Sequence, residues 1–150
     1  MIALSCALLF AGCTGTRPAT LGVRDGRLSP CPASPNCVSS KDSDAAHSIE
    51  PLRYTSSPLQ AMERLKRIVG GMKRAKVITD TDLYLHAEFT SALFRFVDDV
   101  EFVLDEKNRV IHVRSASRVG YSDLGVNRKR VEAIGHAWSA LPDSPSPARP

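Results

Sequence analysis

The sequence is poor in aromatic residues and contains none of the short motifs that identify common enzymes. Phe, Tyr and Trp together make up 6% of the 150 residues, so the stacking platforms that bind nucleic acids are scarce. No Gly-x-Ser-x-Gly elbow, phosphate-cradling loop or His-Glu-x-x-His pair occurs. We therefore expect no nucleic-acid partner, cofactor, metal or catalytic residue, and we favour a binding protein over an enzyme.

Charged side chains are absent from residues 1–12. This stretch is shorter than the ~20 apolar residues that span a bilayer, but it suits the apolar region of a signal peptide. It ends in Phe10-Ala11-Gly12-Cys13, which resembles the bacterial lipobox, where small residues precede a cysteine that is acylated before cleavage. The basic residue that usually precedes the apolar run is missing. We predict a signal peptide over residues 1–12 and a lipid on Cys13.

A lipid on Cys13 predicts a protein anchored in the bacterial cell envelope and facing the periplasm. Thr14 stands where an Asp often retains lipoproteins in the inner membrane, so we expect the outer membrane. Residues 13–30 are small, polar and broken by Gly and Pro, as in a tether. Residues 31–141 then form one folded domain, and the Pro- and Ser-rich residues 142–150 are expected to be disordered.

Few cysteines remain after processing. Cys6 leaves with the signal peptide and Cys13 carries the lipid, so Cys31 and Cys37 are left as a pair. An even pair in an exported protein predicts a disulfide. A metal site is less favoured, because Cys-x5-Cys is not a standard zinc spacing and no second pair follows.

The periodicity of apolar residues predicts a strand over 49–54, a helix, four further strands and a last helix. Ser57 and Gln60 form a capping box at the start of the first helix, and Gly70-Gly71 ends it. Asn127 is expected to cap the last helix. We predict a two-layer α+β domain, with an antiparallel sheet of about five strands and both helices on one face.

The turn between the last two strands fixes how they pair. Apolar residues alternate with polar ones on both sides of Lys107-Asn108, and both apolar faces must meet one core. A two-residue turn satisfies this requirement. It sets Leu104 opposite Ile111, Phe102 opposite Val113 and Glu101 opposite Arg114.

Three segments carry a resemblance to a known family. They are residues 28–40 (Leu-Ser-Pro-Cys-Pro-Ala-Ser-Pro-Asn-Cys-Val-Ser-Ser), residues 94–102 (Phe-Arg-Phe-Val-Asp-Asp-Val-Glu-Phe) and an Arg-rich segment, residues 114–130. The chain resembles the bacterial family called domain of unknown function (DUF) 1499 over residues 21–138. The resemblance implies an exported or membrane-associated domain and transfers no catalytic residue. Gly135-His136 departs from the basic residue expected there, which affects surface charge alone.

The Arg-rich segment is the first candidate site. Cations in the first turn of a helix are disfavoured by the helix dipole, so something negative should offset Arg128 and its neighbours. One possibility is an anionic ligand or an envelope partner bound at the helix N-terminus. The other is an internal network with Asp98, Asp99 or Asp123. The candidate ligand-binding residues are Arg114, Arg118, Tyr121, Arg128 and Arg130.

The polar face of the predicted sheet is the second candidate. Two histidines with nearby carboxylates could bind a metal or transfer protons. Exposed strands also carry opposite-charge pairs without any such role. An enzyme or metal-binding protein using this face is therefore the alternative function. The residues on this face are His86, Glu88, Asp99, Glu101, His112 and Arg114.

Overall fold

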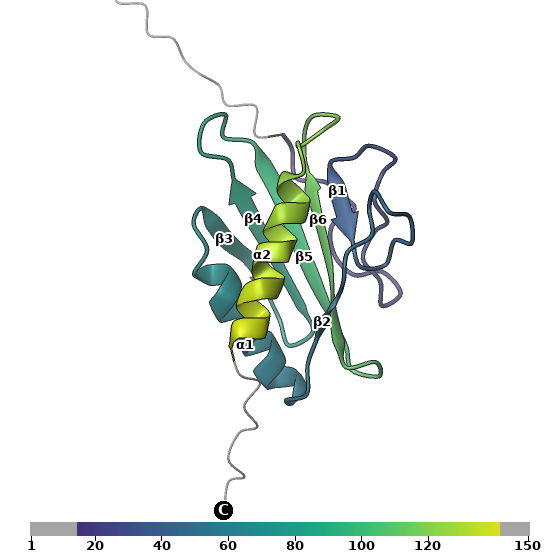
Figure 1. Ribbon diagram of the computed structural model, residues 1–150, viewed down its shortest axis with the longest axis vertical. Helices are drawn as coiled ribbons and strands as arrows, with labels where there is room; N and C mark the ends of the chain where they lie inside the picture. The colour runs from purple at the N-terminus through teal and green to yellow at the C-terminus, as the bar shows by residue number, and fades with distance from the viewer. Residues whose placement is uncertain (1–14, 142–150) are drawn as a thin grey trace, which may run out of the picture.

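The computed structural model describes residues 15–141, which form a six-stranded antiparallel sheet with two helices on one face (Figure 1). The elements are β1 (Cys37–Ser39), β2 (Leu52–Arg53), α1 (Pro58–Gly70), β3 (Ala75–Asp80), β4 (Tyr84–Thr90), β5 (Val97–Asp105), β6 (Val110–Ser117) and α2 (Val126–Ala140). The strand order is β1-β6-β5-β4-β3, and β2 also pairs with β6. The predicted α+β class is confirmed.

Several predicted features lie outside the described residues: the signal peptide over 1–12, the lipid on Cys13 and the tail over 142–150. Within residues 15–141, neither helix is long and apolar enough to cross a membrane.

The β5–β6 hairpin has the register that the sequence predicts. Leu104 pairs with Ile111 and Phe102 with Val113, which puts these four side chains in the core under the helices. The Lys107-Asn108 turn is closed by a hydrogen bond from the Arg109 N–H to the Glu106 carbonyl. Alternation of side chains along a strand then sends Glu101 and Arg114 to the opposite face together.

Helix α1 begins and ends where the sequence signals place its ends. The Ser57 side chain accepts a hydrogen bond from the Gln60 N–H, and the Gln60 side chain accepts one from the Ser57 N–H. This capping box is confirmed, and Gly71 follows the last helical residue. The buried face of the helix packs on the sheet through an apolar stripe that includes Met62, Leu65 and Val69.

The β1/β2 edge differs from the prediction. The expected strand over 49–54 is reduced to Leu52–Arg53, which pairs with β6 alone, as an edge position allows after Pro51. Strand β1 was not predicted because three residues are too few for a periodic signal. Its pairing depends instead on β6, where Val38 lies opposite Ser115.

The start of α2 corrects the prediction that Asn127 is its cap. The N-cap is Gly125, with a positive φ of 78°, and no side chain caps from that position. Asp123, which precedes the helix, takes the capping role instead, because its carboxylate accepts hydrogen bonds from the N–H groups of Gly125 and Asn127. Asn127 lies inside the first turn and is buried, so its side chain is free to bind the sheet.

Candidate functional site

The structure distributes the five predicted ligand-binding residues over three places. Arg114 and Arg118 lie on the sheet face opposite the helices, where each meets a carboxylate. Arg130 lies on the helix side and binds Asp98 at 2.5 Å. Arg128 and Tyr121 lie at the surface, and Tyr121 is 75% exposed.

Asp99 is the centre of the ion-pair network on the sheet face opposite the helices, which we call the polar face. Its residue is only 1% exposed. Arg118 approaches the carboxylate with two nitrogens at 2.8 and 2.7 Å, and His86 Nε2 lies 2.8 Å from the same group. Arg118 also reaches Glu88 at 2.5 Å, and Arg17 reaches the same Glu88 oxygen at 2.6 Å.

Glu101 is the second buried carboxylate of the polar face. The Tyr84 hydroxyl and the Gly22 N–H donate to one of its oxygens, at 2.8 and 2.7 Å. Arg114 lies 3.4 Å from the other oxygen, in agreement with the predicted pairing. Around Asp99 and Glu101 the charges balance, since Arg17, Arg114 and Arg118 face Glu88, Asp99 and Glu101.

The network sets the protonation states of its acids. Burial alone would raise the pKa of Asp99, but hydrogen bonds from Arg118 and His86 outweigh it and hold that pKa below its usual range. Burial also raises the pKa of Glu88, but the hydrogen bonds and charges of the Arg17 and Arg118 guanidinium groups outweigh burial. The pKa of Glu88 therefore lies below its usual value. Both carboxylates are therefore ionised at neutral pH, and their charges are already compensated within the protein.

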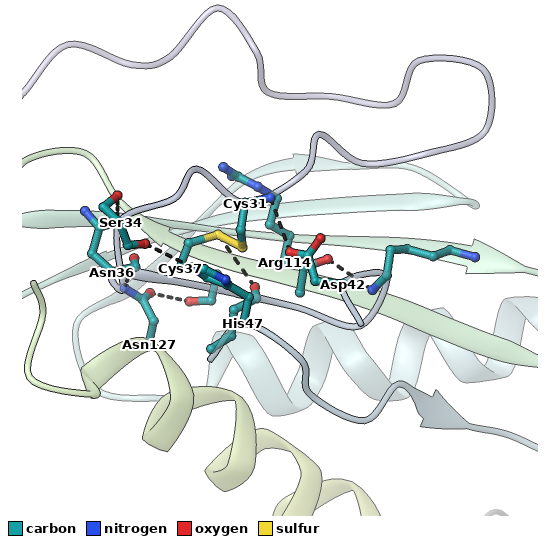
Figure 2. Close-up of a disulfide and its surroundings, with 12 residues drawn as sticks. Cys31, Ser34, Asn36, Cys37, Asp42, His47, Arg114 and Asn127 are labelled. Carbon is teal, nitrogen blue, oxygen red and sulfur yellow. Dashed lines mark hydrogen bonds between the residues drawn. A yellow bond between two sulfur atoms is a disulfide. The ribbon is translucent and has the colours of Figure 1, made fainter. Parts of the chain in front are cut away.

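The polar face is buried, whereas the sequence suggested a solvated one. The segment over residues 15–30, expected to be a tether, lies against this face, with Arg17 on Glu88 and Gly22 on Glu101. In Figure 2 this N-terminal coil and helix α2 lie on opposite sides of the strands. A local sequence pattern does not predict that this segment covers the polar face, because Gly22 and Glu101 are 79 positions apart.

The two histidines of the polar face do not form a common site. His86 binds Asp99, whereas the ring of His112 lies between Ser40 Oγ at 3.1 Å and Asp105 at 3.5 Å. Burial and the nearby Lys41 lower the pKa of His112, so the ring is neutral at pH 7. Among residues 15–141, no group of three or more His, Cys, Asp and Glu side chains could hold a metal ion.

Asn127 joins α2 to the sheet on the helix side. Its carbonyl oxygen accepts from Ser115 Oγ at 2.5 Å and from Arg130 at 2.7 Å. Its amide donates to the Asn36 carbonyl, to Ser117 Oγ and to Asp123. The sequence contained a signal for this role, because Asn127 lies one helical turn before Val131 and so shares the buried face of the helix. The preference of Asn for helix caps favoured the other interpretation.

Cys31 and Cys37 form the predicted disulfide, and its loop is held by polar contacts on each side (Figure 2). Asp42 accepts a hydrogen bond from the Cys31 N–H at 3.3 Å. His47 lies between the Ser34 carbonyl and Asp44. The Ser34 carbonyl raises the pKa of His47, burial opposes this, and Asp44 raises it further, so protonation strengthens the attachment of the loop.

Replacing both Cys31 and Cys37 by Ser is expected to lower the free energy of unfolding by about 2 kcal/mol, because the closed loop is short. Urea denaturation of the purified protein measures the change. Non-reducing mass spectrometry should show the parent two hydrogens lighter than the reduced chain. Two thiols that alkylate freely without reductant would contradict the prediction.

Architecture and site together define a small two-layer α+β domain whose polar face is a closed, self-neutralised ion-pair network. The chain matches the family "Protein of unknown function (DUF1499)" over residues 27–137. It therefore belongs to this family, as its sequence resemblance indicated. A comparison with curated proteins finds no match.

Proposed function

We propose that this domain is a non-enzymatic module of the bacterial cell envelope that binds an anionic ligand, or an acidic segment of an envelope partner, beside Arg128. One observation carries the proposal. Of the arginines in residues 114–130, Arg128 alone contacts no carboxylate of residues 15–141. Its guanidinium lies 3.0 Å from the Ala46 carbonyl and 3.5 Å from the Ala45 carbonyl, and neither of these neutral groups forms an ion pair with it.

Arg128 lies at one end of a surface groove between residues 48–53 and α2. The groove has a volume of about 650 Å³, which is large enough for a small ligand or a short extended segment. Ile49, Val131 and Trp138 contribute apolar surface to it. Glu50, Glu132 and Arg53 also line it. In the proposed complex the anionic group of the ligand lies at the Arg128 end, and its less polar atoms lie beyond.

The geometry favours a binding module over an enzyme that uses the polar face. Its acids are paired with guanidinium groups, and His86 with Asp99. A proton-transfer group needs an accessible partner on the substrate, and residues 15–30 cover this face. The Arg128 groove, in contrast, is open to solvent.

Inorganic phosphate is the simplest probe of the Arg128 site. At tenfold excess over its dissociation constant it should stabilise the parent by about 1.4 kcal/mol, which a thermal melt detects. Arg128→Ala should abolish this stabilisation, and the matched control Lys129→Ala, one residue along α2, should keep it. Sodium chloride at equal ionic strength separates binding from screening. Equal phosphate effects in parent and Arg128→Ala would refute the proposed site.

We also propose that the chain is attached through a lipid on Cys13 to the periplasmic face of the outer membrane. Cys13→Ser should leave the protein unacylated, because a hydroxyl at that position takes no lipid, and mass spectrometry together with membrane fractionation measures the loss. Cys6→Ser is the control, since Cys6 belongs to the removed segment. A Cys13→Ser protein that fractionates with membranes as the parent does would overturn the assignment.

A further inference from the structure

Exposed apolar side chains gather at the end of the sheet where β4 leads into β5. Leu93 is 78% exposed, Phe94 65% and Leu124 86%. A single exposed apolar residue is ordinary on a protein surface, but a group at one end marks a contact surface. We call this group the apolar tip. It consists of Leu93, Phe94, Phe96, Leu124 and Val126.

The loop that presents the tip is closed by its own hydrogen bonds. The Ser91 N–H donates to the Phe96 carbonyl at 2.8 Å, and the Phe96 N–H donates to Ser91 Oγ at 2.9 Å. The rings of Phe94 and Phe96 stack with their centroids 5.6 Å apart. These contacts hold the apolar side chains of the loop in a defined arrangement while they are exposed to solvent.

Two separate loops contribute to the tip because they leave the sheet at the same end. The Arg118 N–H donates to the Val97 carbonyl at 3.2 Å, which ties the end of β6 to the start of β5. Figure 1 shows the β4–β5 and β6–α2 loops at the top of the molecule. Ser91, after β4, and Val126, at the start of α2, also line one shallow hollow.

The rim of the tip is positively charged. Four cations at this end are exposed: Lys73, Arg74, Arg95 and Lys129. The carboxylates nearby are already engaged, since Asp98 binds Arg130, Glu88 binds Arg17 and Arg118, and Asp123 caps α2. Apolar side chains ringed by cations suit the interface of a membrane that contains anionic lipids.

The path of the chain points to the same surface. A Cβ built on Gly15 would lie 2.9 Å from Arg118 Cβ and from Val119 Cγ1, so Gly15 lies against the start of the β6–α2 loop. Cys13 precedes Gly15 by two residues. Two residues span at most ~7 Å. If Cys13 carries a lipid, this short span brings the lipid to the end of the sheet that carries the apolar tip.

We propose that the apolar tip and its cations insert into the anionic headgroup layer of the leaflet that holds the lipid of Cys13, so that the domain stands end-on on the membrane. This inference rests on the proposed lipid attachment. Apolar side chains and cations that enter the same interface add buried apolar area and attraction to anionic lipids, and they fix the orientation of the anchored domain. The Arg128 groove runs along the flank of α2, and none of the residues that line it belongs to the apolar tip.

Depth-dependent fluorescence quenching tests the orientation. The lipidated full chain is reconstituted into vesicles of phosphatidylethanolamine and phosphatidylglycerol with brominated acyl chains, carrying Phe94→Trp as the probe. Leu83→Trp is the matched control, because Leu83 is 49% exposed in the β3–β4 turn at the opposite end of the sheet. Trp138 is buried and adds the same background to both. We expect quenching at position 94 about twofold or more above that at position 83.

A charge reversal adds an independent readout. Lys129→Glu in the Phe94→Trp protein should reduce the quenching in these vesicles and leave it unchanged in phosphatidylcholine vesicles, since only the anionic lipids attract the lysine. Equal quenching at positions 94 and 83 would overturn the proposal and leave the tip to a protein partner. If mass spectrometry finds no acyl group on the protein, the lipid attachment is refuted but the insertion of the tip is not. Quenching at positions 94 and 83 can still be compared after excess vesicles are added to the unacylated protein, so the insertion of the tip is tested without the anchor.

Discussion

Arg118→Ala is expected to lower the free energy of unfolding by about 3–5 kcal/mol, because it leaves the buried carboxylate of Asp99 without its main partner. Glu88 loses a partner as well and keeps its ion pair with Arg17. For a domain of this size the melting temperature should fall by roughly 10–20 °C. Arg27→Ala is the matched control, since this arginine is exposed and its removal should cost less than about 0.5 kcal/mol.

The pH dependence of this loss identifies its cause. In the parent, the pKa values of Asp99 and Glu88 are lowered by folding. The stability they contribute is present above their unfolded pKa values of ~4 and is lost as the pH falls through their folded values. Without Arg118 both pKa values rise. The difference between parent and Arg118→Ala should therefore be largest at neutral pH and shrink below pH ~4, as urea titrations at several pH values can show. A pH-independent loss would point to packing instead.

Asn127→Ala is expected to cost about 3 kcal/mol or more, because a single truncation leaves several buried polar groups without partners. Ser115 Oγ loses its acceptor, and the Asn36 carbonyl loses one of its donors. Lys129→Ala, in the same helical turn but exposed, should change stability by less than about 0.5 kcal/mol. Chemical denaturation of both variants gives the comparison. Equal, small effects would show that the network around Asn127 contributes little to folding.

Features that depend on local chemistry were predictable from the sequence. The capping box at Ser57 and the β5–β6 register follow from hydrogen-bonding groups and apolar periods within a few residues of each other. The α+β class follows from the sum of such signals. Strand β1 was missed because three residues carry no period, and it pairs only because β6 supplies the partner.

The candidate site was harder to predict, because pairing of charges depends on contacts between distant segments. The alternatives of an internal network and a ligand at the Arg-rich segment both used the same residues. The structure gives carboxylate partners to Arg114, Arg118 and Arg130 and none to Arg128 within residues 15–141. Nothing in the sequence near Arg128 distinguishes it from Arg130 two residues later. The difference is geometric, since only Arg130 points toward β5.

Strand β6 has consequences for the order in which the chain folds. It pairs with β5 through a tight turn, but it is also the partner of β1 and β2, which lie within residues 37–53. Asn36 and Asn127, which meet beside it, are 91 residues apart. Closing such long loops is slow, whereas a hairpin forms in microseconds. The β5–β6 hairpin should therefore nucleate the sheet, and the N-terminal coil should dock last. A chain that ends before Val110 would lack β6 and with it Arg114 and Arg118, so the polar face that Arg17 and Gly22 cover would be incomplete.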